Sequence, residues 1–192
     1  MVGMRLTGQS ALVVIDVQNA GIADAWDRDG VVARIATLIA RARDEGVPVI
    51  SVRHEEPGLP SQERGAWGWR FDDRVAPLPG ERVIGRQYPD AFANTVLADA
   101  LDAMDVTHVI IAGVGTDFGI QATVCRAIAE GWHVTLAGDC HTTASVSGGL
   151  SGEHVVSHAN AALASLEYPG RVVEVVPHDE VSFSVAVMQG AA

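Results

Sequence analysis

The sequence predicts a three-layer αβα fold built around a Rossmann-like, mostly parallel sheet of six strands. Apolar runs bounded by turn residues alternate with helical patterns along the chain, as they do in βαβ units. Several of these runs are apolar throughout, which is typical of strands buried on both faces of a parallel sheet. A chain of 192 residues also suits one domain with one large core, so we expect residues 1–192 to form a single domain.

The first half of the chain begins with a strand predicted at residues 11–16, where an apolar run ends in a carboxylate. A helix is predicted from Asp29, because apolar residues recur at helical spacing until Gly46 stops the pattern. Residues 47–52 form the second predicted strand. Residues 55–80 carry four prolines and three large aromatic residues with little periodicity, so we expect an ordered loop folded over a pocket.

The second half continues the alternation, with elements expected at residues 83–84 (strand), 93–104 (helix), 106–112 (strand), 116–130 (helix), 133–137 (strand), 153–166 (helix) and 172–176 (strand). The helix at 116–130 has clear boundary signals, because Thr116 and Asp117 can cap its start and Gly131 can end it. The strand that follows it leads to Asp139. Residues after Asp179 are expected to form a loosely attached tail.

Composition and charge restrict the classes of function. Hydrophobic residues make up 48% and charged residues 19%, which is globular composition, and no apolar run reaches the ~20 residues of a membrane helix. The net charge of −11 and the scattered basic residues argue against nucleic acid as a partner. The N-terminal residues lack a secretory pattern, so a cytoplasmic protein is expected. Cys125 and Cys140 are expected to be ordinary buried thiols.

Candidate functional residues stand where the predicted strands end, because parallel sheets bind ligands beyond the carboxyl ends of their strands. Asp16 ends an otherwise apolar strand, and a buried carboxylate is costly unless it is paired or functional. Capping of nearby loop amides is the structural alternative for Asp16. Residues 113–119 place glycines at a strand-to-helix turn, where backbone amides can face an anion or a developing oxyanion.

Three other interpretations concern cofactors, metals and nucleophiles. The glycine turn approaches a dinucleotide fingerprint with Asp139 as the ribose-binding acid, but its spacing is G-x-G-x-x-x-G and it follows a late strand. His154 and His158 stand four residues apart on a predicted helix, although no third metal ligand is evident. Cys125, His141 and Asp139 would form a triad only if the fold brings them together. We therefore predict neither a metal nor a cofactor.

The order of three stretches resembles the isochorismatase-like family, also called the cysteine hydrolases. Residues 11–18 look like the family's strand that ends in its catalytic Asp. Residues 83–97 are similar to its pattern of an apolar pair, a Lys, then Ala-Phe and a helix start. Residues 113–123 resemble the turn with the nucleophilic Cys and a non-proline cis peptide, here Val114-Gly115. Supporting matches are Trp67-Gly68, Asp139-Cys140-His141-Thr142-Thr143 and His158-Ala159-Asn160.

Two of the three catalytic positions implied by this resemblance differ from the family pattern. Asp16 matches the Asp, but Arg86 stands at the Lys position and Gly119 at the Cys position. Arginine keeps its charge, so Arg86 can hold Asp16 or a substrate carboxylate but cannot shuttle protons. Cys125 cannot replace the thiol, because six helical residues place it about 120° around the helix and roughly 9 Å along it. The residues implied to bind substrate are Gln18, Trp67, Tyr88, Val114, Gly115 and Phe118.

True isochorismatases resemble this sequence in having Gly at the Cys position, and they cleave a vinyl ether without a covalent intermediate. The resemblance therefore implies a hydrolase that acts on a small-molecule metabolite without a cysteine nucleophile. Asp16 would be the general acid or base for enol-ether or related C–O or C–N cleavage. The alternatives are an inactive ligand-binding or assembly homologue, and a cysteine amidase whose Cys is replaced at Gly119. The family also implies a homo-oligomer.

Overall fold

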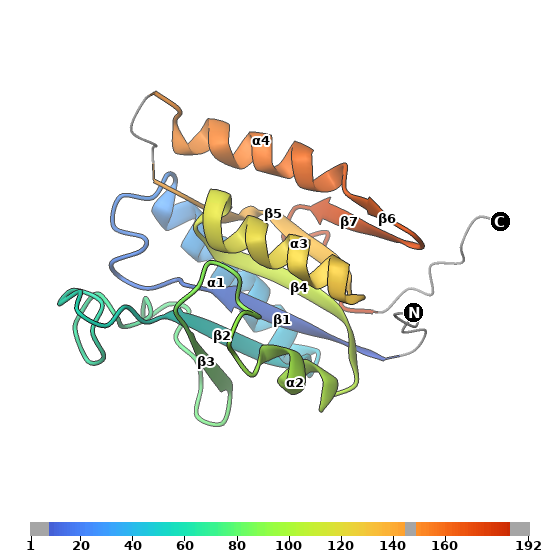
Figure 1. The fold of residues 1–192 in the computed structure, drawn as a ribbon, viewed down its shortest axis with the longest axis horizontal. Helices are drawn as coiled ribbons and strands as arrows, with labels where there is room; N and C mark the ends of the chain where they lie inside the picture. Colours follow the sequence, from blue (N-terminus) through green and yellow to red (C-terminus); the bar gives the residue numbers. More distant parts are fainter. Residues whose placement is uncertain (1–7, 145–148, 185–192) are drawn as a thin grey trace.

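The computed structural model describes residues 8–144 and 149–184, which form a seven-stranded sheet between two layers of helices (Figure 1). The strand order is β3-β2-β1-β4-β5-β7-β6. The strands are β1 (Gln9–Ile15), β2 (Val49–His54), β3 (Arg82–Arg86), β4 (Val106–Val114), β5 (His133–Thr142), β6 (Glu167–Tyr168) and β7 (Arg171–Val176). All neighbouring strands pair in parallel except β6 and β7. The predicted αβα fold with a mostly parallel sheet is therefore confirmed.

The prediction of six strands missed β6, which pairs antiparallel with the start of β7. A strand of two exposed residues is too short to show a hydrophobic period, so the sequence carries no signal for it. The six strands that were predicted are all present. The sheet is thus one strand wider than expected, at the edge farthest from β3.

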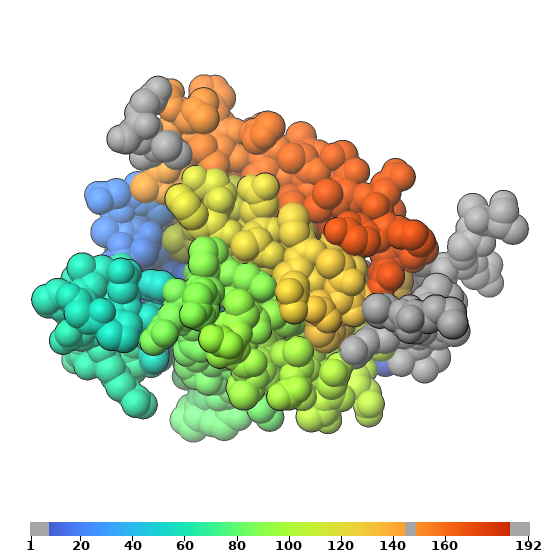
Figure 2. Space-filling view, viewed as in Figure 1, coloured from blue at the N-terminus to red at the C-terminus, as the bar shows by residue number. Residues whose placement is uncertain are grey.

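The helices cover the two faces of the sheet unequally. They are α1 (Arg28–Asp44), α2 (Leu97–Asp102), α3 (Gln121–Glu130) and α4 (Gly152–Ala164). Helix α1 packs its buried residues into one hydrophobic cluster with β1 and β4, while α2, α3 and α4 share a second cluster on the other face. In the space-filling view α2, α3 and α4 cover the visible face, and the segment after β2 projects beside them (Figure 2).

Two predicted helices begin later than the sequence suggested. Residues 93–96 lie outside α2, because Asn94 has a φ of 56°, in the left-handed region that breaks a right-handed helix. Residues 116–120 form a π-helical turn ahead of α3. Thr116 and Asp117 do not cap this helix; their side chains bond to His141 and Thr143 instead. Gly131 ends α3 as predicted, with a φ of 107°.

The prediction of a loosely attached tail after Asp179 is wrong for the described residues up to Ser184. Val181 and Phe183 are buried against the α1 face of the core. Arg41 of α1 donates hydrogen bonds to the carbonyls of His178 and Val181. Two apolar side chains spaced two residues apart were the sequence signal for this attachment. Residues 185–192 lie outside the described part of the chain.

The carboxyl ends of β1 and β4 approach each other closely. Ile15 pairs with Gly113 in the parallel ladder, and Gly113 has a φ of 140°, a conformation that favours glycine. A Cβ at Gly113 would overlap the carbonyl oxygen of Ile15. This glycine therefore lets the two central strands end side by side.

In the described residues no helix has the length and apolarity that a membrane crossing requires.

Replacement of Gly113 by Ala should lower the free energy of unfolding by about 3 kcal/mol or more, because backbone strain and steric overlap add at this site. Urea unfolding monitored by circular dichroism measures the loss. Gly46→Ala is the matched control, since Gly46 also has a positive φ (72°) but a Cβ there meets nothing within 4 Å. The control should lose only about 1 kcal/mol, and equal losses would contradict the close-approach explanation.

Candidate active site

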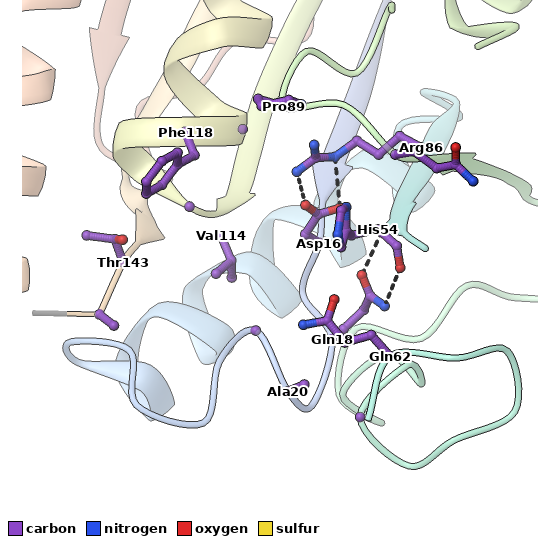
Figure 3. A pocket seen from close by; sticks show the side chains of 16 residues that line it. Asp16, Gln18, Ala20, His54, Gln62, Arg86, Pro89, Val114, Phe118 and Thr143 are labelled. Carbon is purple, nitrogen blue, oxygen red and sulfur yellow. Dashed lines mark hydrogen bonds and ion pairs between the residues drawn. The ribbon is translucent and has the colours of Figure 1, made fainter. Parts of the chain in front are cut away.

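A cavity of about 380 Å³ opens at the carboxyl ends of β1, β2, β3 and β4 (Figure 3). Seven of the predicted site residues line it, namely Asp16, Gln18, Arg86, Val114, Gly115, Phe118 and Gly119. His54, Gln62, Gln87 and Thr143 add polar groups to its wall. The predicted substrate contacts Trp67 and Tyr88 do not line this cavity; both side chains are largely exposed, at 66% and 50%.

Asp16 and Arg86 form a buried ion pair in the wall of this cavity. Asp16 follows β1 with a φ of 53°, which is uncommon for a residue other than glycine and is often found at functional sites. Arg86 ends β3, and its Nε donates to Asp16 Oδ1 at 3.2 Å while Nη2 donates to Oδ2. Its Nη1 donates to the Tyr88 carbonyl. The two side chains are only 12% and 6% exposed.

The surroundings of Asp16 favour its protonated form. Burial raises the pKa of the Asp16 carboxyl above its ordinary value, while the nearby Arg86 guanidinium and His54 oppose part of that rise. A carboxyl group with a raised pKa is suited to proton transfer nearer neutral pH. Its partner Arg86 can stabilise the carboxylate that remains after the proton has left.

Gln18 connects the end of β1 to the neighbouring segments through its side-chain amide. Its Oε1 accepts from the His54 backbone N–H at 2.8 Å, and its Nε2 donates to the carbonyls of His54 and Trp69, each at 3.0 Å. Both ends of the amide are therefore bonded to the backbone. This geometry favours a positioning role for Gln18 over the substrate contact that the family resemblance implied.

His54 stands among the residues that the sequence places at the ends of strands, but the sequence analysis gave it no role. It ends β2, lines the cavity and lies beside Asp16 (Figure 3). Its Nε2 lies 3.3 Å from Glu56 Oε2, and its buried Nδ1 has no hydrogen-bond partner in the described part of the chain. The signal was its place at the end of a strand beside Asp16. A buried ring nitrogen without a partner is uncommon in folded proteins and often marks a functional site.

The turn between β4 and α3 forms the part of the cavity wall that adjoins the Asp16–Arg86 pair. The expected cis peptide at Val114-Gly115 is not found: the described residues contain no cis peptide bond. The turn is made instead by positive φ angles at Gly113 and Gly115, of 140° and 83°. Phe118 of this turn is 65% exposed and stands at the cavity mouth with Thr143 (Figure 3).

A buried network behind this turn holds it in place. Burial lowers the pKa of His141, so its imidazole is neutral. Nε2 of His141 donates to Asn160 Oδ1 at 2.8 Å, which leaves Nδ1 to accept from the Thr116 hydroxyl at 3.0 Å. Thr143 donates to Asp117 Oδ1 at 2.8 Å. These bonds attach Thr116 to β5 and Asp117 to Thr143, the residue that follows β5.

The structure does not assemble the Cys125, His141 and Asp139 triad. His141 bonds to Thr116 and Asn160, while the Asp139 carboxylate bonds to His178 Nδ1 at 2.7 Å. Both cysteines are free, and burial raises the pKa of each thiol. Cys140 is buried, as the sequence suggested, whereas Cys125 is only partly buried.

The candidate metal and nucleotide ligands are also engaged elsewhere. His154 lies close to Ser151 at the start of α4. Asp139, Cys140 and His178 cluster with their ligand atoms within 4.8 Å of one another. However, Asp139 is bonded to His178 and lies 3.7 Å from the Arg34 guanidinium, whose charge repels a cation. The Asp139 carboxylate is therefore already engaged by His178 and Arg34. This argues against a role for Asp139 as a metal ligand or as the ribose-binding acid of a nucleotide site.

Comparisons with known proteins agree with this geometry. The family model described as Isochorismatase domain matches residues 10–173. Streptothricin hydrolase from Streptomyces noursei is 33% identical, over 88% of this chain and 68% of that protein. A second streptothricin hydrolase from that organism is matched over 62% of its length. Ureidoacrylate amidohydrolase RutB from Methylobacterium radiotolerans is 29% identical, over 81% of this chain and 72% of its own.

A solved structure supports the same relationship. An isochorismatase from Pseudomonas putida KT2440 superposes with a TM-score of 0.82 at 26% sequence identity. The match covers 94% of this chain and 92% of that chain. The likeness therefore extends over nearly the whole of both chains.

Replacement of Arg86 by Met should lower the free energy of unfolding by about 3–5 kcal/mol at pH 7, because the buried Asp16 carboxylate loses its partner. Arg86 lowers the pKa of Asp16, so its removal raises that pKa further above the unfolded value. A raised pKa in the folded state makes stability fall as pH rises through the interval between the two values. The loss should therefore be smaller at pH 4 than at pH 7, as urea unfolding at several pH values can measure.

The control is the double variant Asp16→Asn/Arg86→Met, which carries neither charge. It should be more stable at pH 7 than Arg86→Met alone, and its stability relative to the unmodified protein should change less with pH. An equal loss at every pH in Arg86→Met would contradict the assignment of the loss to the Asp16 carboxylate.

Proposed function

Because the chain belongs to the isochorismatase family of hydrolases, we propose that it hydrolyses a small-molecule substrate without a cysteine nucleophile, using Asp16 as general acid or base. The observation that carries this proposal is the buried Asp16–Arg86 pair in the cavity wall, beside a turn whose residue 119 has no side chain. A cavity of about 380 Å³ suits a small molecule. No cofactor is needed for this chemistry.

For an enol-ether substrate, Asp16 acts first as an acid. The protonated carboxyl transfers its proton to the enol carbon, which leaves an oxocarbenium-like cation on the substrate and a carboxylate paired with Arg86. Water adds to the cation and returns a proton to Asp16. The resulting hemiketal then breaks its C–O bond to give a carbonyl product and an alcohol. The raised pKa of Asp16 supports this route, because it keeps the proton available.

For an amide substrate, Asp16 acts as a base toward water. The carboxylate takes a proton from a water molecule as its oxygen attacks the carbonyl, and the tetrahedral intermediate then expels the amine with the proton held by Asp16. The relatives named streptothricin hydrolase and ureidoacrylate amidohydrolase support C–N cleavage as the alternative to C–O cleavage. Backbone groups of the turn at residues 114–119 would face the carbonyl oxygen.

A ligand-binding or assembly protein without catalysis is the second candidate. It is favoured by the absence of a nucleophilic side chain at Gly119 and by the engagement of Arg86 with Asp16. The two candidates differ in one measurable respect: a binding protein gives saturable binding without product.

We also propose that the protein is a homo-oligomer. Large apolar side chains stand exposed beside the cavity in the described residues, among them Trp67, Tyr88 and Phe118. Contact with a second copy would remove this apolar surface from water. Light scattering on the full chain tests this, and a monomer at micromolar concentration would contradict it.

Asp16→Asn should reduce turnover by about 10²–10⁴-fold, since this substitution removes the proton-transfer group while preserving the shape of the side chain. Turnover is measured by mass spectrometry on a panel of small enol ethers and small amides. Asp117→Asn is the matched control, because Asp117 lies in the neighbouring turn and bonds to Thr143; it should keep most of the activity.

The fold of each variant is checked by its thermal unfolding midpoint. Full activity in Asp16→Asn would overturn the proposal. Saturable binding of a panel compound by calorimetry, with no product from the unmodified chain, would instead support the binding protein.

A further inference from the structure

Gly119 is not required by the backbone conformation at its position. Its φ lies outside the left-handed region, unlike those of Gly113 and Gly115 in the same turn. Any L-amino acid can adopt such a conformation. Gly119 is also a buried residue inside the π-helical turn. Glycine in such a position lowers helix stability relative to alanine. The reason for glycine here must therefore be the space that a side chain would occupy.

Arg86 occupies that space. A Cβ at Gly119 would lie 2.7 Å from Arg86 Nη2 and 3.5 Å from its Cζ. The first of these distances is shorter than real Cβ contacts, while the next neighbour, Ile15 Cγ2 at 3.6 Å, would be in ordinary contact. Among the described residues, the guanidinium is therefore the group that would have to move to admit a Cβ at residue 119.

The guanidinium cannot move without breaking its hydrogen bonds. Nε and Nη2 both donate to the Asp16 carboxylate, and Nη1 donates to the Tyr88 carbonyl. Both charged groups are buried, so a displaced guanidinium leaves Asp16 without a partner. A lysine at residue 86 would differ in shape, because it ends in a single ammonium and lacks the fork that carries Nη2.

We propose that Gly119 is a positioning residue, whose missing side chain forms the slot that holds the Arg86 guanidinium on Asp16. The arginine at 86 and the glycine at 119 are then one linked arrangement instead of two independent features. A nucleophilic side chain at residue 119 is incompatible with the Asp16–Arg86 pair. This inference rests on the proposed role of Asp16 only for its effect on turnover, and the slot itself can be tested without a substrate.

A double-mutant cycle in urea unfolding at pH 7 tests the slot without any substrate. The variants are Gly119→Ala, Arg86→Lys and Gly119→Ala/Arg86→Lys. Gly119→Ala should raise the unfolding equilibrium constant in both backgrounds. The rise should be at least about tenfold larger in the unmodified background than in the Arg86→Lys background, because the effects of substitutions at contacting residues are coupled. Additive losses would overturn the proposal. This outcome does not depend on whether the protein is an enzyme.

The pKa of Asp16 gives a readout that a purely structural role for Gly119 would not move. Displacement of Arg86 weakens the interaction that lowers this pKa, so Gly119→Ala should shift it upward. The carboxyl carbon of Asp16, followed by NMR during a pH titration, reports this shift in the folded protein. An unchanged pKa in a folded Gly119→Ala variant would overturn the proposal.

Gly119→Cys gives the sharpest contrast in activity. We expect this variant to lose at least about tenfold in kcat/KM on any substrate that the unmodified chain turns over, and to gain no amide hydrolysis. Addition of Arg86→Lys should recover part of the loss. A gain of amide hydrolysis by Gly119→Cys alone would overturn the linkage of residues 86 and 119. If the unmodified chain turns over none of the panel compounds, the proposed function fails. The double-mutant cycle and the Asp16 titration still test whether Gly119 forms the slot for Arg86.

Discussion

The buried ion pair between Asp16 and Arg86 joins the central strand β1 to the edge strand β3 across the end of β2. It requires the left-handed backbone of Asp16, the Tyr88 carbonyl as a third partner of the guanidinium, and an empty space at Gly119. Apolar residues of similar volume often stabilise a fold as well as a buried ion pair does. Chemistry in the adjoining cavity therefore explains this pair better than stability does.

The turn at residues 113–120 depends on a different kind of support. Gly113 allows β4 to end beside Ile15, and the buried His141 fixes Thr116 through a neutral imidazole. The wall that faces Asp16 is thus held by hydrogen bonds to β5, without contribution from a side chain at residue 119. In the proposed mechanism, such a wall keeps the bound substrate oriented toward the carboxyl group, and orientation of this kind is a main source of rate enhancement.

The sequence was sufficient to predict the fold because strands buried on both faces are continuous apolar runs, and each run ends where parallel sheets bind ligands. Asp16 was found in this way. The same patterns could not show that Arg86, seventy residues later, bonds to it, because a tertiary contact leaves no local period. Gln18 was selected by resemblance as a substrate contact, although its side-chain amide is hydrogen-bonded to the backbone of His54. His54 belongs to no motif that would have assigned it a role. Asn94 shortened a predicted helix by a single unfavourable φ.

Glycine is usually explained by backbone freedom, and Gly113 and Gly115 fit that explanation. Gly119 does not, because its φ is ordinary and the space at its Cβ position is filled by Arg86 Nη2. An arginine fork at residue 86 therefore determines which side chains residue 119 can carry. As long as that fork is paired with Asp16, the cavity has one buried carboxyl group with a raised pKa and no room for a nucleophile beside it. In the proposed mechanism, this carboxyl group transfers protons to the substrate and water makes the attack.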